Sequence, residues 1–325
     1  MKRILVSGAS GIVGYGILRS LRLARDDVFL VGTSIYEDSV APAFCDVFEK
    51  ALPTHHPDYL EWLLKVLQRY TIDMLIPGIE ADLYHWVENQ GVIQATGASP
   101  LLNDTSLILL CKDKWQFYEA LRASAQPCAI PSALDANFAE LAERFGLPFL
   151  LKPRRGFGSK GLVRVPDAAS FVRHQKMMGN ILLAQPLVGN DDEEFTTSAF
   201  GDGHGAYYAE ITLRRKLSPD GFTDRAEVVD SAQFRETLIE LCKQFRPLGP
   251  TNFQFRLGPQ GPLLLEINPR ISSSTSIRSA FGYNESAMAV AYFLEGRSPC
   301  QPLIRRGRAV RYTDEQVFYD DSFPF

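Results

Sequence analysis

The most informative stretch of the chain is Thr251-Asn252-Phe253-Gln254-Phe255-Arg256-Leu257, followed after a Gly-Pro-Gln-Gly turn by Leu263-Leu264-Leu265-Glu266-Ile267-Asn268-Pro269-Arg270. Two apolar runs joined by such a turn predict a β-hairpin. Side chains alternate along a strand, so Asn252, Gln254 and Arg256 share one face, beside Glu266 and Asn268 on the second strand. We expect the other face to pack on a core through Phe253, Phe255, Leu257, Leu265 and Ile267.

The polar face of this hairpin has the chemistry of a magnesium site. A carboxylate beside amide oxygens offers hard ligands, and Mg²⁺ takes one or two protein carboxylates while phosphates and water complete its shell. Arg270, just beyond, can make paired hydrogen bonds to a phosphate or a carboxylate. The alternative is an ordinary amphipathic hairpin with a solvated face, but such a face more usually carries Lys, Glu or Thr.

A glycine-rich segment, Lys152-Pro153-Arg154-Arg155-Gly156-Phe157-Gly158-Ser159-Lys160-Gly161, lies between two strand-like runs. A glycine loop between two strands can fold over a nucleotide and direct backbone N–H groups at phosphate oxygens. The four interleaved cations favour this interpretation over a solvated hairpin loop. The pattern G-x-x-x-x-G-K-[ST] is absent from the sequence, as are the His-Arg-Asp and Asp-Phe-Gly motifs, which excludes a P-loop and a protein kinase.

A second glycine motif opens the chain. The run Ile4–Val6 leads into Gly8-x-x-Gly11-x-x-Gly14, then an amphipathic stretch to Ala24 and a second run, Val28–Val31, which predicts a βαβ unit. A dinucleotide site would place an acidic residue near the end of the second strand, yet the first acids are Glu37 and Asp38. The glycines are therefore better explained by close packing of the turn on the sheet. An NAD-dependent oxidoreductase or epimerase is the alternative.

The remaining pattern divides the chain in two. Helices at Tyr59–Tyr70 and Glu80–Gln90 around a strand at Met74–Ile76 extend the first unit to about residue 100 as an open, parallel α/β domain. After Asn103 strand-like runs dominate, with helical stretches between them, which predicts an α+β arrangement. The fold class is thus parallel α/β followed by α+β.

Composition and charge argue against some classes of binding partner. The 325 residues carry a net charge of −4 and no long basic run, which argues against a nucleic-acid or anionic-membrane surface. No apolar run approaches the roughly 18 residues that a transmembrane helix needs. The five cysteines are widely spaced without a C-x-x-C pair, as expected in a reducing compartment. We expect a cytoplasmic protein.

Together the polar hairpin, the glycine loop and the upstream lysines resemble the ATP-grasp superfamily, and in particular one synthetase half of the carbamoyl phosphate synthetase large subunit and related carboxylate–amine ligases. The resemblance implies a Rossmann-like pre-ATP-grasp domain at 1–105 and a two-lobed ATP-grasp domain at 106–312, with a tail at 313–325. The N-lobe would span about 106–185 and the C-lobe about 186–312. In such proteins the first domain binds substrate rather than NAD.

The resemblance also assigns residues. It implies ATP contacts from Lys114, Lys152, Gly156, Gly158, Ser159, Gly161, Gln185, Leu187, Glu193, Glu194 and Gln254. Magnesium would be held by Glu266, Asn268 and Gln254, and the catalytic groups would be Arg270, Asn268 and Lys216. Lys216 stands in a basic run that is equally explained as a solvated turn.

The sequence departs from the family pattern at several positions. Gln185 stands where many relatives have Glu, and Asn190-Asp191-Asp192 lengthens the step to the acids, so either Glu193 or Glu194 can meet the ribose. Gln254 replaces a carboxylate at the first metal position, which favours one Mg²⁺ over two. The chain is shorter than two synthetase halves, which disfavours carbamoyl phosphate synthesis.

The resemblance implies an ADP-forming ligase that joins a small-molecule carboxylate to an amine through an acyl phosphate, with a homodimer as one expected assembly. A non-catalytic ATP-binding protein is a further alternative. Ser272–Thr275 and Arg278 are candidates for a carboxylate pocket. Glu80 and Asp82 either face the substrate or simply favour the start of a helix.

Overall fold

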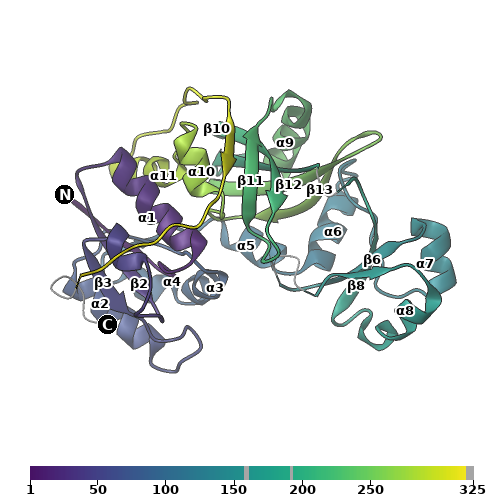
Figure 1. Ribbon diagram of the computed structural model, residues 1–325, viewed down its shortest axis with the longest axis horizontal. Coiled ribbons are helices and arrows are strands. Elements are labelled where there is room, and N and C mark those ends of the chain that lie inside the picture. Colours follow the sequence, from purple (N-terminus) through teal and green to yellow (C-terminus); the bar gives the residue numbers. More distant parts are fainter. Residues whose placement is uncertain (157–160, 191–192, 320–325) are drawn as a thin grey trace.

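The computed structural model describes residues 1–156, 161–190 and 193–319. Strands in these ranges form a parallel sheet near the N-terminus, a small antiparallel sheet and a larger antiparallel sheet. Figure 1 shows the small sheet projecting at one end of the molecule, the large sheet in the middle and the parallel sheet at the other end. The structure thus has the mixed α/β architecture that the sequence predicts.

The N-terminal sheet has the order β3-β2-β1-β4-β5, and each neighbouring pair is parallel. Its strands are β1 (Lys2–Val6), β2 (Val28–Ser34), β3 (Val47–Lys50), β4 (Met74–Ile76) and β5 (Ser99–Pro100), and its helices are α1 (Ile12–Ala24), α2 (Tyr59–Arg69), α3 (Glu80–Glu88) and α4 (Gln90–Gln94), with a 3-10 turn at Ala41–Phe44. The sheet is buried on both faces, as continuous apolar strands of this kind require.

The glycines of the first turn are explained by packing. A Cβ on Gly14 would lie 2.2 Å from the carbonyl oxygen of Gly8, and a Cβ on Gly78 would lie 2.1 Å from that of Ser7. The turn after β1 and the turn after β4 therefore pack backbone against backbone, which side chains would prevent. This geometry supports the packing interpretation of Gly8, Gly11 and Gly14.

The small sheet has the antiparallel order β7-β6-β8, and we refer to this sheet and its helices as the N-lobe. Its strands are β6 (Phe149–Pro153), β7 (Val163–Val165) and β8 (Leu182–Pro186), and they carry α7 (Phe138–Phe145), α8 (Ala168–Val172) and a 3-10 turn at Gln175–Met177. Leu141, Phe149 and Phe171 fill a core of its own.

The large sheet forms the C-lobe, in the order β13-β12-β9-β10-β11-β14. Its strands are β9 (Glu194–Asp202), β10 (Tyr207–Leu217), β11 (Thr223–Val228), β12 (Leu248–Gly258), β13 (Gly261–Asn268) and β14 (Arg308–Val310). Helices α5 (Thr105–Cys111), α6 (Lys114–Ala123), α9 (Ala232–Phe245), α10 (Thr275–Ala280) and α11 (Glu285–Glu295) complete the elements. Phe117 and Leu121 of α6 pack into the core of the large sheet, although α6 lies within the range 106–185 expected for the N-lobe.

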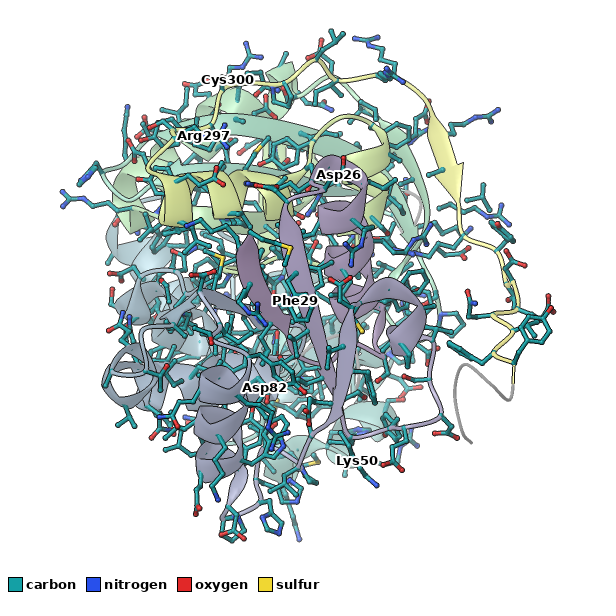
Figure 2. All side chains as sticks on the ribbon, turned by 90° about the vertical axis from the view of Figure 1, so that its left-hand side faces the viewer. Asp26, Phe29, Lys50, Asp82, Arg297 and Cys300 are labelled. Carbon is teal, nitrogen blue, oxygen red and sulfur yellow. The ribbon has the colours of Figure 1, made fainter. Side chains whose placement is uncertain are left out.

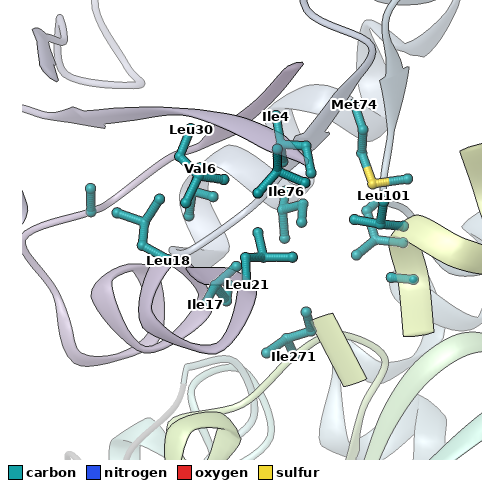
Figure 3. Packing of buried hydrophobic residues seen from close by; sticks show 14 of the residues in the cluster. Ile4, Val6, Ile17, Leu18, Leu21, Leu30, Met74, Ile76, Leu101 and Ile271 are labelled. Atoms are coloured by element: carbon teal, nitrogen blue, oxygen red, sulfur yellow. The ribbon is translucent and has the colours of Figure 1, made fainter. Parts of the chain in front are cut away.

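The N-terminal domain and the C-lobe share one core. Ile271, Phe200 and Val290 of the C-lobe lie in the same apolar cluster as the strands around β1 (Figure 3). After β14 the described part of the chain runs back along the N-terminal domain (Figures 1 and 2). Within the described part of the chain, no helix combines the length and apolarity needed to cross a membrane.

Candidate functional site

A cavity of about 610 Å³ lies where the N-terminal domain, the N-lobe and the C-lobe meet. Each part supplies a wall: Ile12, Val13 and Glu80 come from the first domain, Leu150, Lys152 and Arg164 from the N-lobe, and Glu194, Gln254, Glu266 and Asn268 from the C-lobe sheet. An apolar strip comes from Pro186, at the end of β8, and from Leu187 and Val188, which follow it. The cavity volume is within the range of about 300–1,000 Å³ typical of small-molecule sites.

The polar hairpin forms as predicted, with one correction. Gln254 stands opposite Glu266 and Asn252 opposite Asn268, but the register shifts after Gln254, so that Leu264 pairs with Phe255. This bulge turns Leu264 into the C-lobe core and Leu265 into the cavity. The expectation that Leu265 packs in the core is therefore wrong, because an extra residue in one strand moves the side chains beyond it to the other face.

The predicted magnesium ligands lie together. Glu266, Asn268 and Gln254 all line the cavity, and Asn268 Nδ2 donates to Glu266 Oε1 at 2.9 Å. Among the described residues no group of three His, Cys, Asp or Glu side chains is placed to hold a metal. One carboxylate with two amide oxygens still fits Mg²⁺, because that ion draws its other ligands from phosphates and water.

Two lysines bring positive charge to the same space. Lys114, the first residue of α6, donates from Nζ to the carbonyl of Gly156 at 2.8 Å, which ties α6 to the start of the glycine loop. Lys152 lines the cavity from β6. Burial, opposed by the carboxylate of Glu266 and helped by the nearby charges of Lys114 and Arg256, lowers the pKa of Lys152 to about 8.

Arg154 has a different position from these lysines. Its guanidinium donates to Asp113 Oδ2 at 2.7 Å and to the carbonyl of Gly179 at 2.6 Å. Asp113 in turn caps α6 by accepting from the backbone N–H of Trp115 at 2.9 Å. Arg154 therefore holds the first turn of α6, and with it Lys114, against the N-lobe.

The carboxylate of Glu194 lines the cavity and pairs with two arginine side chains. Arg215 Nε and Nη2 donate to Glu194 Oε1 at 3.1 and 2.7 Å, and Arg256 Nη2 lies 3.6 Å from Glu194 Oε2. Of the two acids left open by the sequence, Glu194 lines the cavity, whereas Glu193 is exposed. Sequence reasoning missed Arg215, because its pairing with Glu194 depends on the register of β9 and β10.

The residues of the glycine loop and of the end of β8 that were predicted to contact ATP lie in different surroundings. Leu187 and Gly156 line the cavity, while Gly161 is exposed and is not among its lining residues. The Gln185 side chain is buried and donates to Ser132 Oγ at 2.8 Å, so it joins β8 to the segment before α7. Gly158 and Ser159 lie outside the described residues.

The structure does not bring Lys216 to this cavity. Lys216 is exposed and lines a hollow on the outer face of β10, β11 and β14, whereas its neighbour Arg215 points inward. This geometry does not support a catalytic role for Lys216 in the cavity, because successive side chains of a strand point to opposite faces.

Arg270 and Glu80 join two domains inside the cavity. Arg270 Nη2 donates to Glu80 Oε1 at 2.6 Å, and both side chains are mostly buried. Glu80 also lies in the first turn of α3, so it lines the cavity and stands where an acid favours the start of a helix. Asp82, labelled in Figure 2, does not face the cavity: it is buried and accepts hydrogen bonds from Thr54 and Tyr59.

The proposed carboxylate pocket is only partly formed. Ser272 and Ser273 line the cavity. Arg278 is fully buried beneath it, where it pairs with Glu285 at 3.0 Å and donates to Ser272 Oγ at 3.0 Å. Arg278 therefore supports the serine loop from below and does not reach a ligand.

Comparisons with known proteins agree with this architecture. A family model described as "ATP-grasp in the biosynthetic pathway with Ter operon" matches residues 181–316. The uncharacterised protein y4rH of Sinorhizobium fredii is 28% identical over 191 residues, 53% of this chain and 38% of that protein. The arginine-specific carbamoyl phosphate synthase large chain of Bacillus subtilis is 25% identical over 224 residues, 62% of this chain and 22% of that one.

A solved structure shares the fold over nearly the whole chain. N5-carboxyaminoimidazole synthetase from Staphylococcus aureus, complexed with ADP, superposes with a TM-score of 0.70 at 15% identity and covers 93% of this chain and 80% of that chain. The protein thus has the ATP-grasp fold, and the comparisons bear out its resemblance to that superfamily and to carbamoyl phosphate synthases. The chain spans less than two-fifths of the length of these two curated relatives.

Proposed function

We propose that this protein is an ADP-forming ligase that joins a carboxylate to an amine through an acyl phosphate. The observation that carries the proposal is the meeting, in one cavity, of two lysines, an oxygen-rich hairpin and an arginine–glutamate pair from two domains. The first two features suit a magnesium nucleotide, and the third lies where a second molecule can react with it. The ATP-grasp fold and the ADP complex of the superposed enzyme support a nucleotide.

In this proposal each wall of the cavity has a task. Lys114 and Lys152 bind the α- and β-phosphates, and the apolar strip at Pro186–Val188 receives the base. Glu266, Asn268 and Gln254 hold Mg²⁺, which neutralises charge on the phosphates. Arg270, Ser272 and Ser273 bind the substrate carboxylate with N–H and O–H donors.

The reaction then proceeds in two transfers. A carboxylate oxygen attacks the γ-phosphorus, the bond to the β-phosphate oxygen breaks, and ADP leaves. The amine nitrogen next attacks the acyl carbon, the C–O bond to phosphate breaks, and inorganic phosphate leaves with that electron pair. Arg270 contributes by holding the carboxylate in line with the γ-phosphate, because catalysis of phosphoryl transfer rests on positioning and charge stabilisation.

The first test is ADP release from Mg²⁺-ATP against a matrix of carboxylates, with hydroxylamine as a trap for the acyl phosphate. We expect one carboxylate to drive ADP release and to form a hydroxamate. ADP release that no carboxylate stimulates would contradict the ligase proposal. A thermal shift with ATP but not with NAD, measured in parallel, would separate an inactive ATP-binding protein from an oxidoreductase.

Glu266→Ala tests the metal assignment. Removal of the carboxylate is expected to lower hydroxamate formation by about 100-fold or more, since a preorganised charge partner at a reacting group has that order of effect. Glu236→Ala, at an exposed position of α9, is the matched control and is expected to keep full activity. Full activity of Glu266→Ala would overturn the metal assignment.

A further inference from the structure

A second, smaller cavity of about 250 Å³ lies beside the first. Six residues line both cavities, namely Glu80, Lys114, Gly156, Glu266, Asn268 and Arg270. These include the proposed metal ligands and the pair that joins the two domains. A molecule in the second cavity would therefore reach the reacting groups from a direction different from that of the nucleotide.

The far wall of the second cavity belongs to α3, α5 and α6 and has a mixed character. Its apolar part comes from Leu83, Ile108 and Phe117. Lys112 is exposed and has its Nζ 4.5 Å from the centre of the Tyr84 ring, and Arg155 is exposed with its Nε 3.5 Å from Asp113 Oδ2. The shared wall carries both carboxylates of the second cavity, Glu80 and Glu266, together with the cations Lys114 and Arg270. The far end carries cations alone, Lys112 and Arg155.

The second cavity thus has carboxylates at one end only, which selects a particular kind of molecule. Because Glu266 holds Mg²⁺ in the proposed site, a protonated amine is attracted to Glu80, and an acidic group at the other end of the same molecule is attracted to Lys112 and Arg155. Arg270 donates to Oε1 of Glu80, and Oε2 of the same glutamate can accept from the ammonium group. A volume of about 250 Å³ lies below the usual range for drug-sized ligands, about 300–1,000 Å³, and suits a single small molecule.

We propose that the second cavity binds the amine substrate, and that this amine carries an acidic group, as an amino acid does. The assignment rests on the ligase function proposed above. In the transfer, the ammonium group first loses a proton to solvent. Its nitrogen then forms the C–N bond, the C–O bond to phosphate breaks, and the departing phosphate takes a second proton from the nitrogen.

Filling the cavity from an exposed position provides the test. Ala81 is exposed on α3 and lines the second cavity but not the first, so Ala81→Trp adds a large side chain there without disturbing a core. Ala123→Trp makes the same change at an exposed position of α6 that lines neither cavity. The probes are hydroxylamine, ethylamine, the twenty common amino acids and β-alanine, each with the carboxylate that forms a hydroxamate.

We expect at least one amino acid to have a kcat/KM at least tenfold above that of ethylamine. Ala81→Trp is expected to lower that value tenfold or more while hydroxamate formation, which uses a nucleophile of two heavy atoms, changes less than about twofold. Lys112→Gln is expected to reduce the preference over ethylamine, and Ala123→Trp to change nothing.

Three results would overturn the assignment: use of no amino acid, use of ethylamine as readily as amino acids, or an equal effect of Ala81→Trp on hydroxamate and amide formation. Absence of a hydroxamate from the wild-type protein with every carboxylate would instead contradict the ligase function itself. The two failures are therefore distinguishable in one set of assays.

Discussion

Lys152 is a cation whose charge depends on its surroundings. Burial in the cavity wall lowers its pKa to about 8, and the neighbouring Lys114 acts in the same direction. The protonated form, which attracts phosphate, therefore dominates below pH 8 and is lost above it. In a site that binds nucleotide through this group, affinity must fall on the alkaline side.

We predict that the Kd for Mg²⁺-ATP is nearly constant from pH 7 to 7.5 and rises above pH 8 by up to about tenfold per pH unit. Isothermal titration calorimetry from pH 7 to 9.5 measures this. Lys152→Arg keeps its charge throughout that range and should flatten the profile. A wild-type profile as flat as that of the arginine variant would show that Lys152 does not bind the phosphates.

At the residue scale, the sequence predicted those site residues whose position follows from one strand or one motif. Glu266, Asn268 and Gln254 were found because alternation in a hairpin puts them on one face, which the structure confirms. Arg215 was missed and Lys216 was chosen in its place. That choice required the register between β9 and β10, which is set by long-range pairing and has no local signal.

At the scale of secondary-structure elements, the β12–β13 hairpin shows the same limit on what the sequence can predict. Its existence, turn and polar face were predictable from about twenty residues of sequence. The bulge was not, because Leu263, Leu264 and Leu265 are identical side chains and alternation cannot tell which of them faces the core. In the folded chain the backbone N–H of Leu264 donates to the carbonyl of Cys128 at 2.8 Å. This hydrogen bond fixes Leu264 as the leucine that faces the core.

Adjacent leucines in this hairpin should therefore respond differently to truncation. Leu264→Ala removes a side chain that is 3% exposed in the C-lobe core and is expected to lower the free energy of unfolding by about 2–5 kcal/mol. Leu265→Ala faces the cavity and should cost less than about 1 kcal/mol. Urea denaturation of both variants measures the difference, and equal losses would place the bulge elsewhere.

The first helix offers a second test at this scale. Alanine normally stabilises a helix relative to glycine by about 0.5–1 kcal/mol. Gly14→Ala in α1 should nevertheless destabilise the protein, since its Cβ would lie 2.2 Å from a backbone oxygen. Gly91→Ala in α4, where a Cβ meets nothing within 4 Å, is the control and should stabilise. A thermal melt in which Gly14→Ala is neutral would contradict the packing explanation of the motif.

Over the whole molecule, the sequence predicted a parallel α/β unit followed by an α+β unit, and the structure has this arrangement. It did not predict which of these parts share a core. Ile271 follows the polar hairpin in the chain, yet it packs on the N-terminal sheet (Figure 3), while the N-lobe encloses a separate cluster around Leu141. The cluster that Ile271 shares with β1 and β2 joins residues more than 200 positions apart, so local patterns cannot reveal it.

The arrangement of cores predicts how the molecule opens. Ile271→Ala should weaken the N-terminal domain and the C-lobe together, because its side chain contributes to a cluster that both share. Leu141→Ala should lower stability mainly within the N-lobe, whose core is its own. Each truncation is expected to cost about 2–5 kcal/mol locally.

Amide hydrogen exchange read by mass spectrometry separates the two cases. We expect faster exchange in peptides covering β1, β4 and β12 for Ile271→Ala, and in peptides covering β6 and β8 for Leu141→Ala. Mg²⁺-ATP, which in our proposal contacts both lobes, should slow exchange in the N-lobe of Leu141→Ala by coupling it to the rest of the protein. Uniformly faster exchange in both variants would mean that the three parts open as one unit, and the N-lobe would then not be free to move over the nucleotide.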